Sequence, residues 1–413
     1  MTQIRPFRPY LVSADRAGVV VAPAYDSMLP AERAAFSSKN PSNFINTMRV
    51  EEEFPKSARP SAETLLQRNR ATVQGLLDDG SFRQFEEDAV YVYRLQTEDH
   101  VQTGVVAEVP VDEYQSGRIR RHEHTRPDHE DRLTRYLEVV GLSSSPVCLA
   151  YADNPSISAK LSEITSRVPE LDFLLDDGVR QWVWRVTDKG EIQSLQNGFF
   201  PSVSSAYLTD GHHRTAASSR YFSRQAGEAD DHGSGSWKYF LAALFPAGEL
   251  RILAFNRCIR DLNGLSLQRL VDSISEHFAV EALADPQKAG LPQSPGEFMM
   301  LAGESVYRLR VRRESVPEDP VLKLDVSLLQ NLILEPLLGI TNSRSDARLD
   351  YVTGNSGLEG LRQRLSEGWQ VAFACFPTSM VDLMAVADLG RVMPAKSTCF
   401  DPKVRSGIFL RFY

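Results

Sequence analysis

The most informative segment for the fold is Ala206-Tyr-Leu-Thr-Asp-Gly-His-His-Arg-Thr215, which lies near the middle of a 413-residue chain. Residues 206–208 are apolar and predict a short strand, whereas residues 215–225 have the character of a helix. A helix that begins directly after a strand presents free N–H groups and the positive end of its dipole, and both favour an anion. The segment therefore predicts a strand, a tight turn and an anion-binding helix start.

The polar residues of this segment suit a site for phosphate groups. Gly211 allows the backbone to approach a ligand closely, and Arg214 offers a bidentate fork to a phosphate. His212 and His213 can donate hydrogen bonds or move protons near neutral pH. Asp210 could hold a histidine tautomer or bind Mg²⁺. A helix cap would explain Asp210 alone, so we interpret the segment as a functional site.

A second polar segment is Arg120-Arg-His-Glu-His-Thr-Arg-Pro-Asp-His-Glu-Asp-Arg132. A run of charge by itself usually marks a solvated surface, but three histidines within eight residues are more than such a surface needs. We therefore predict that this segment and the Asp210 segment meet in space. Glu123 is then a catalytic candidate, and His122 and Arg126 are candidates for binding substrate.

A third polar segment, residues 393–407, is loop-like and punctuated by proline. The cations and hydroxyls that it supplies suit an anionic ligand, and they are Lys396, Ser397, Thr398, Lys403 and Arg405. Residues 408–413 are apolar and predict a final strand docked in a sheet, which would hold the preceding loops rigidly. We expect Lys396, Ser397, Thr398 and Arg405 to bind substrate in the same pocket.

The rest of the chain alternates between helical and strand-like patterns, which predicts a mixed α/β fold of the α+β class. Strands are expected over residues 18–26, 89–95, 104–111, 147–151, 181–186, 239–244, 250–255, 306–311 and 371–374. Helices are expected over residues 60–80, 156–168, 267–278, 326–338 and 358–367. We divide the chain into a catalytic core, residues 1–285, and a C-terminal α/β region, residues 286–413, which contributes its basic loop to the same site.

Composition limits the class of protein. Hydrophobic residues make up 42% and charged residues 24% of the chain, as in ordinary globular proteins. A net charge of −8 argues against nucleic acid as a partner. The four cysteines are scattered, which indicates neither a zinc site nor a disulfide framework. Without a signal-peptide pattern or an apolar run of ~20 residues, we expect a cytoplasmic protein without membrane contact.

Several common nucleotide and hydrolase motifs do not occur in the sequence. There is no G-x-x-x-x-G-K-[ST], no G-x-G-x-x-G after a strand, no H-E-x-x-H and no G-x-S-x-G. A nucleotide would therefore bind through neither a P-loop nor the usual dinucleotide fold.

The three polar segments also belong to a longer set of ordered landmarks. Over essentially its whole length the chain resembles a prokaryotic family known as domain of unknown function ten-fifteen. The matching landmarks are Pro6-Phe7, Ala22-Pro-Ala-Tyr-Asp26, Asn40-Pro-Ser-Asn-Phe44, His122-Glu-His-Thr-Arg-Pro-Asp128, Asp210-Gly-His-His-Arg214, Asn256-Arg257, Asp261-Leu-Asn-Gly264, Leu324-Asp-Val-Ser327, Met393-Pro-Ala-Lys-Ser-Thr398 and Pro402-Lys-Val-Arg-Ser-Gly407.

The Asp-Gly-His-His-Arg box is also similar to the phosphate-contacting box of free serine kinases in the ParB and sulfiredoxin-like superfamily. This resemblance implies a ParB/sulfiredoxin-like core elaborated by further sheets and helices. It implies that Gly211, His212, His213, Arg214 and Thr215 bind the phosphates of ATP or ADP.

These features together favour an enzyme that transfers a phosphoryl group to a small hydroxylated metabolite, with free L-serine as the specific acceptor. Such a transfer needs positioned cations, usually with Mg²⁺, and a base for the acceptor hydroxyl. Asp210 is the candidate metal ligand, and the base is one of Glu123, Asp210, His212 and His213. Small-molecule substrate and nucleotide are the expected partners.

Three other functions fit the same residues. A phosphatase would use the same pocket with water as the acceptor. A nucleotide-binding regulatory protein related to ParB would bind without catalysis. A metal hydrolase would use His122, His124, His212 and His213, although no acidic ligand has diagnostic spacing.

Overall fold

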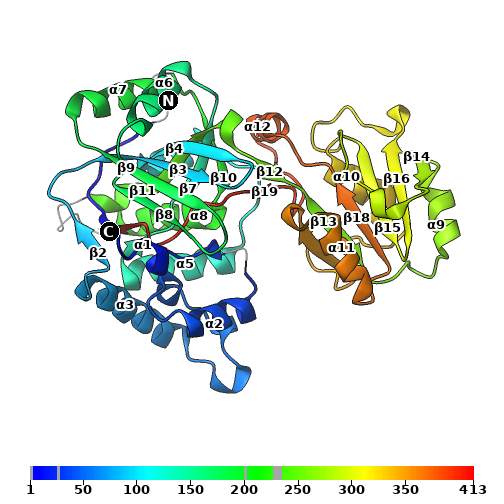
Figure 1. Ribbon diagram of the computed structural model, residues 1–413, viewed down its shortest axis with the longest axis horizontal. Helices are drawn as coiled ribbons and strands as arrows, with labels where there is room; N and C mark the ends of the chain where they lie inside the picture. Colours follow the sequence, from blue (N-terminus) through cyan, green and yellow to red (C-terminus); the bar gives the residue numbers. More distant parts are fainter. Residues whose placement is uncertain (1–2, 26–27, 200–201, 227–234) are drawn as a thin grey trace. The chain divides into compact units, whose positions relative to one another are not determined.

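A computed structural model describes residues 3–25, 28–199, 202–226 and 235–413 of the chain. The chain forms two compact units, Met1–Leu250 with Pro402–Tyr413, and Arg251–Asp401 (Figure 1). The structure therefore confirms a mixed α and β fold with several sheets. No helix in the described ranges is long and apolar enough to cross a bilayer.

An eight-stranded sheet forms the centre of the first unit. Its strands, in spatial order, are β5 (Ile119–Arg120), β10 (Ala206–Asp210), β7 (Val147–Tyr151), β11 (Tyr239–Pro246), β4 (Val101–Pro110), β3 (Val90–Gln96), β9 (Arg180–Val186) and β8 (Leu171–Leu174). Five of the predicted strands fall on β3, β4, β7, β9 and β11, because each is an apolar run of strand length. β10 pairs parallel with β5 and antiparallel with β7.

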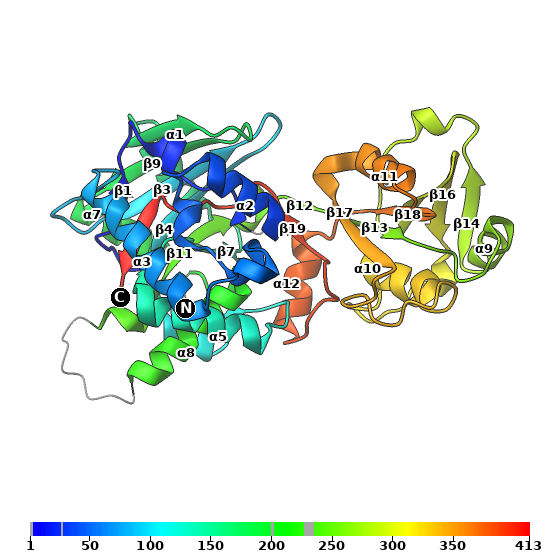
Figure 2. The same ribbon diagram turned by 90° about the horizontal axis from the view of Figure 1, so that it is seen from below.

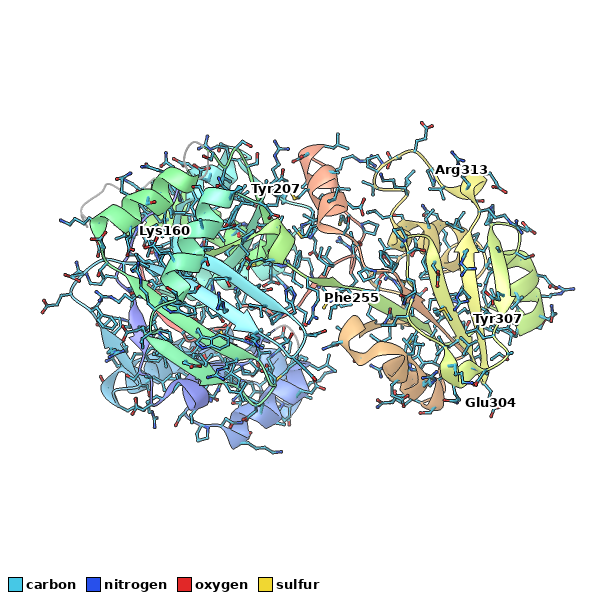
Figure 3. All side chains as sticks on the ribbon, turned by 45° about the horizontal axis from the view of Figure 1, so that its top comes forward. Lys160, Tyr207, Phe255, Glu304, Tyr307 and Arg313 are labelled. Carbon is cyan, nitrogen blue, oxygen red and sulfur yellow. The ribbon has the colours of Figure 1, made fainter. Side chains whose placement is uncertain are left out.

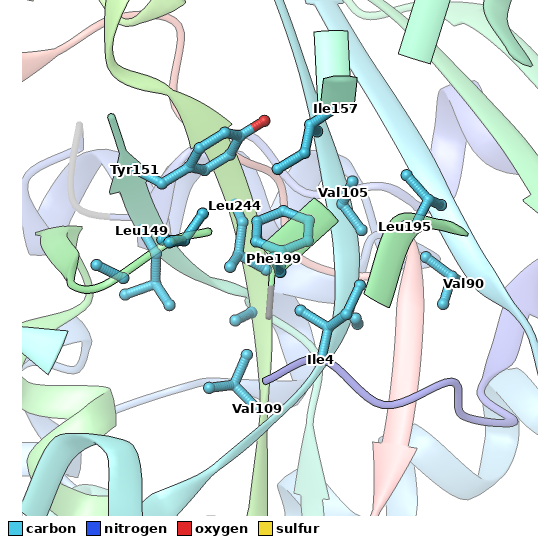
Figure 4. Close-up of a cluster of buried hydrophobic side chains, with 14 of the residues drawn as sticks. Ile4, Val90, Val105, Val109, Leu149, Tyr151, Ile157, Leu195, Phe199 and Leu244 are labelled. Carbon is cyan, nitrogen blue, oxygen red and sulfur yellow. The ribbon is translucent and has the colours of Figure 1, made fainter. Parts of the chain in front are cut away.

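Apolar side chains from this sheet and from two helices make the main core of the first unit. The helices are α6 (Pro155–Thr165) and α7 (Lys189–Phe199). Figure 4 shows Tyr151 and Phe199 packed together, with ring centroids 5.0 Å apart. Val90, Val105 and Leu244 are fully buried in the same cluster. The core thus fixes β7, which is the strand beside β10.

The other helices of the first unit are α1 (Ala17–Val20), α2 (Pro30–Lys39), α3 (Ala62–Asp78), α4 (Val111–Gln115), α5 (Pro127–Val140) and α8 (His212–Gln225). Short 3₁₀ segments are Phe44–Thr47, Glu51–Glu53, Lys56–Ala58, Ser236–Lys238 and Ala247–Glu249. Ser61 caps α3, since its hydroxyl accepts a hydrogen bond from the Thr64 N–H at 3.2 Å, and this helix falls on the one expected over residues 60–80. Figures 1 and 2 both show α5 beside α8, and an ion pair of 2.6 Å between Glu130 and Arg220 joins them.

A four-stranded sheet joins the two ends of the chain. Its order is β2 (Phe82–Gln84), β1 (Tyr10–Val12), β20 (Phe409–Phe412) and β6 (Leu142–Ser143). The fully buried Phe409 ring contacts Phe7 and Tyr91. The prediction of a docked final strand is therefore confirmed.

The strand predicted over residues 18–26 is wrong for its described part. α1 covers Ala17–Val20, and one isolated bridge joins Ala22 to Ser406. A short apolar run does not distinguish a strand from a buried helical turn. Asp26 lies outside the described residues.

The second unit is built on an antiparallel sheet of six strands. Their order is β14 (Phe278–Ala282), β16 (Ser305–Val311), β15 (Glu297–Ala302), β18 (Val371–Cys375), β13 (Phe255–Ile259) and β17 (Leu349–Thr353). One face packs on α9 (Leu267–Ile274), α10 (Asp325–Leu329) and the π-helical turn Gln330–Leu334, and the other on α11 (Gly357–Ser366). The remaining elements are α12 (Met380–Asp388), the pair β12 (Ile252–Leu253) and β19 (Cys399–Phe400), and 3₁₀ turns at Pro286–Lys288, Arg313–Ser315 and Gly354–Ser356.

The two units divide at other positions than the sequence division at 285/286. Residue 285 follows β14, which is an edge strand of the second unit's sheet. The chain leaves the first unit after Leu250 and returns at Pro402. Local composition does not reveal such a return, because it depends on the pairing of β20 with β1.

Candidate functional site

The Asp210 box, residues 210–214, includes the end of β10, the turn at Gly211 and the first residues of α8. Tyr207 of β10 is labelled in Figure 3. Gly211 has φ 95° and is the residue before α8. The positive φ favours glycine, and a Cβ there would make a tight contact of 3.0 Å with the Arg214 guanidinium. The first N–H groups of α8 therefore follow Asp210 closely along the chain.

Two cations hold Asp210. Arg214 Nη2 donates to Asp210 Oδ2 at 2.5 Å, and Lys403 Nζ lies 3.3 Å from Oδ1. Arg214 Nη1 donates to the Pro146 carbonyl at 2.9 Å, which fixes the guanidinium against the sheet. Burial alone would raise the pKa of Asp210, but the charges of Lys403 and Arg214 outweigh it and lower the pKa to about 2. Asp210 is therefore an ionised carboxylate at neutral pH.

His122 and His212 form a buried pair beside this carboxylate. The parallel pairing of β5 with β10 sets Ile119 opposite Ala206, and the chain after β5 then reaches the box. The two rings are perpendicular, with centroids 4.7 Å apart, and their residues are 2% and 6% exposed. Burial lowers the pKa of His122 to about 4, and burial together with the neighbouring His122 lowers the pKa of His212 well below its usual value. The pair is neutral at pH 7, and the predicted convergence of the two segments is confirmed.

A second helix begins at the same place. The Arg126 N–H, directly before α5, donates to His213 Nε2 at 3.0 Å. The His129 ring lies 5.0 Å from the His213 ring. The N-termini of α5 and α8 therefore meet around His213, and their two positive dipole ends act on one region.

The segment before Asp26 also approaches the C-terminal segment. The Ala22 N–H donates to the Ser406 carbonyl at 3.0 Å, three residues after Lys403. Tyr25 stacks on Arg33, whose Nε pairs with the buried Glu53 at 3.1 Å. Burial raises the pKa of the Tyr25 hydroxyl. Sequence reasoning assigned no role to this network, although Tyr25 lies in one of the landmarks.

The structure places the other predicted residues as follows. Thr215 is buried, and its hydroxyl donates to the Gly211 carbonyl at 3.1 Å, so it stabilises the start of α8. Glu123 is half-buried next to His122. The Arg126 side chain is exposed and pairs with Asp128 at 2.7 Å.

The third predicted segment is shared between the two units. Lys396, Ser397 and Thr398 belong to the second unit. Arg405 belongs to the first unit, where it pairs with Asp177 at 2.7 Å. Lys403 is the residue of this segment that reaches Asp210. The segment was recognised as basic, but local sequence does not show which of its cations turns toward the box.

The arrangement of the acidic side chains limits how this site could bind a metal ion. In the described part of the chain, no group of three or more His, Cys, Asp or Glu side chains is arranged to hold a metal ion. Asp210 offers one carboxylate, and both of its oxygens already face cations. Mg²⁺ in nucleotide sites commonly uses one or two carboxylates together with phosphate oxygens. Asp210 therefore suits such a metal as a single protein ligand, with phosphate oxygens of a nucleotide as the other ligands.

The family of the chain follows from comparison of its sequence with known families. Residues 4–327 match the family described as "Protein of unknown function (DUF1015)". This match covers more than half of the chain, and the chain belongs to that family. No curated protein sequence matches it.

Comparison with solved structures finds several similar chains. A free serine kinase in complex with AMP has 12% identity and a TM-score of 0.34, covering 74% of this chain and 91% of that one. A free serine kinase variant in complex with ADP has 12% identity and a TM-score of 0.36, with coverage of 76% and 94%. SbnI from Staphylococcus aureus has 13% identity and a TM-score of 0.38, with coverage of 73% and 85%. These values are too low to transfer a function.

Proposed function

We propose that this chain is a phosphotransferase that uses ATP or ADP to phosphorylate a small hydroxylated metabolite, with free L-serine as the acceptor. We further propose that β10, the box and α8 form a ParB/sulfiredoxin-like core. The nucleotide phosphates would bind at Gly211, His212, His213, Arg214 and Thr215, at the start of α8.

The observation that carries the proposal is the position of two cations on one carboxylate at a helix start. Arg214 and Lys403 together carry two positive charges, and Asp210 carries one negative charge. These three groups by themselves sum to one positive charge, and the starts of α5 and α8 add partial positive charge. Positioned cations and helix N-termini stabilise the charge of a transferring phosphoryl group. A phosphate group is the ligand that this arrangement favours most.

The geometry also narrows the choice of general base. Asp210 is a weak base, because its pKa is about 2 and its oxygens face Arg214 and Lys403. His213 Nε2 already accepts a hydrogen bond from Arg126. His212 Nε2 has no hydrogen-bond partner among the described residues, and its ring is neutral at pH 7. Burial also holds the pKa of His212 well below that of a free histidine, so His212 is a weak base as well. We therefore assign the proton of the acceptor hydroxyl to Glu123, which is half-buried next to His122, with His212 as the remaining candidate.

Mg²⁺, when bound, would supply positive charge that neutralises part of the charge on the phosphates. Asp210 is the residue of this site that would hold it. Arg214 and Lys403 would then orient the donor phosphates, and Glu123 would take the proton.

The test is the formation of phosphoserine from L-serine, measured with ATP and with ADP in the presence of Mg²⁺. Arg214→Ala should reduce turnover by about 10²–10³-fold, the range for removing one positioned donor to a transition state. Arg224→Ala is the matched control, because Arg224 lies on the same helix and pairs with Glu138. This control should keep near-normal turnover.

Measuring nucleotide binding distinguishes an error in the proposed acceptor from an error in the proposed site. A nucleotide at a hundredfold excess over its dissociation constant should stabilise the folded chain by about 2.7 kcal/mol. If neither ATP nor ADP raises the melting temperature and no phosphoserine forms, the proposed function is wrong. If nucleotide binds and depends on Arg214 but serine is not phosphorylated, only the acceptor is wrong.

A further inference from the structure

Lys396 has an unusual backbone conformation for its residue type. Its φ is 56°, and among the described non-glycine residues only Lys396 and Asn263 have positive φ. Asparagine enters the left-handed region readily because its short side chain can bond locally. A lysine has no such compensation, and strained residues persist where their surroundings over-determine them, often at ligand sites.

The surroundings of Lys396 hold its loop by several hydrogen bonds. Arg257 Nη2 donates to the Lys396 carbonyl at 3.1 Å. The Thr378 hydroxyl donates to the Ser397 carbonyl at 3.1 Å. The Ser397 hydroxyl donates to the Pro394 carbonyl at 2.6 Å. The Lys396 carbonyl and both the carbonyl and the hydroxyl of Ser397 are thus held by hydrogen bonds, which restrain the loop in this conformation.

Two aromatic rings lie against the cations of this region. Lys396 Nζ is 4.9 Å from the centre of the Phe255 ring, and Arg257 Cζ is 5.4 Å from that of Tyr351. The two rings meet edge to face, with centroids 6.2 Å apart. Figure 3 labels Phe255 at the start of β13. Aromatic faces attract a cation but leave its full charge in place.

The acidic residues of the second unit, all of them described, form no ion pair with either cation. Lys396 is exposed, Arg257 is 4% exposed, and neither forms an ion pair with any residue of the fully described unit Arg251–Asp401. The buried Arg257 donates hydrogen bonds to the carbonyls of Phe255 and Lys396, and these neutral acceptors leave its positive charge in place. The loop, the rings and the two cations together form a positively charged site.

We infer that the Lys396 loop is a binding site for an oxyanion of a small molecule, either a phosphate or a carboxylate. The Lys396 ammonium contacts the ligand, and Phe255 supports the ammonium from behind. Arg257 is a positioning residue, because it holds the Lys396 carbonyl and adds a second charge. The inference does not rest on the proposed phosphotransfer, since the second unit supplies all of these residues.

Titration calorimetry on the full chain tests the site with inorganic phosphate, phosphoserine, L-serine and acetate. Lys396→Gly removes the ammonium and accepts the positive φ without strain, so this variant should melt no lower than the wild type. It should bind the preferred anion at least tenfold more weakly, while Lys396→Arg should stay within about threefold. Lys288→Ala, which removes an exposed lysine paired with Asp285, is the control and should bind normally.

The panel distinguishes the two sources of the oxyanion. Loss of phosphate and phosphoserine binding identifies a phosphate site, and loss of serine and acetate binding identifies a carboxylate site. The inference is overturned if no anion binds the wild type, or if Lys396→Gly binds every anion as the wild type does.

The variant Arg214→Ala shows whether a failure belongs to the Lys396 site or to the proposed phosphotransfer. Anion binding that needs Lys396 but survives Arg214→Ala, with no phosphoserine formed, would support this site and contradict the phosphotransfer. If nucleotide binding needs Arg214 but Lys396→Gly changes no anion affinity, the nucleotide site is supported and the Lys396 site is contradicted.

Discussion

Replacing Asp210 by asparagine tests the charge cluster directly. The substitution keeps the size of the side chain but removes the charge that Arg214 and Lys403 share. At about 1.4 kcal/mol for each pKa unit, the lowering of the Asp210 pKa from 3.8 to about 2 corresponds to about 2 kcal/mol. Asp210→Asn should lose at least that much at pH 7, because two cations then face each other without a carboxylate.

The same ion pairs predict a pH window. The folded pKa of Asp210 is lowered, so its contribution to stability is present above about pH 4 and is lost as the pH falls through about 2. For a unit of this size, about 2 kcal/mol lowers the melting temperature by about 4–8 °C. Urea unfolding at pH 7 gives the free energy itself, provided that the slope with denaturant is unchanged.

Phosphate should restore part of the lost stability. A phosphate ion can take the place of the missing carboxylate between Arg214 and Lys403, so 20–50 mM phosphate, roughly, should stabilise Asp210→Asn more than it stabilises the wild type. Sodium chloride of equal ionic strength is the control, because general screening would act alike on both proteins. Asp131→Asn, which breaks an exposed pair with Arg220, should lose less than about 1 kcal/mol.

A double-mutant cycle tests whether Asp210 and Lys403 interact. If the cluster is real, Asp210→Asn and Lys403→Met should be strongly non-additive, because each removes the same interaction. Equal stability of Asp210→Asn and wild type, or additive losses in the double variant, would show that the carboxylate does not hold these cations.

Four further predictions follow from single features of the structure. Gly211→Ala should cost about 1–2 kcal/mol for the left-handed backbone alone, and more because its Cβ would meet the Arg214 guanidinium at 3.0 Å; equal melting temperatures would contradict this. Buried neutral His122 should make the fold lose stability as the pH falls from about 6.5 to about 4, since the unfolded chain binds the proton first; His122→Gln should flatten that part of a stability–pH curve. Removal of residues 407–413 should unfold the first unit, because β20 pairs with both β1 and β6; a native circular dichroism spectrum of the shortened chain would show that β20 is dispensable. EDTA should leave the melting temperature unchanged, and a collapse of the fold would reveal a structural metal.

The parts of the candidate site differ in how far the sequence predicts them. The box itself was visible in the sequence, because a strand, a glycine and a helix start follow one another within ten residues and their chemistry is local. The helix α3 and most strands of the main sheet were visible for the same reason. Each depends on side-chain period or on hydrogen bonds between near neighbours.

The partners of the box depended on contacts between distant residues. The parallel pairing of β5 with β10 brings His122 to His212, and sequence alone offered only two polar segments that were expected to meet. Lys403, rather than Arg405, faces Asp210 because of how residues 402–406 enter the first unit, where Arg405 turns to Asp177.

What the sequence by itself determined is therefore the helix start, its glycine and its basic and histidine side chains, since these are set by neighbours along the chain. Only the tertiary structure decided which charges compensate one another and where the units divide. It also revealed the left-handed backbone of Lys396, which no local preference of lysine predicts. The physical reason is the same in each case: ion pairs, burial and imposed backbone strain depend on residues that lie far apart in the chain, and folding alone brings them within a few ångströms.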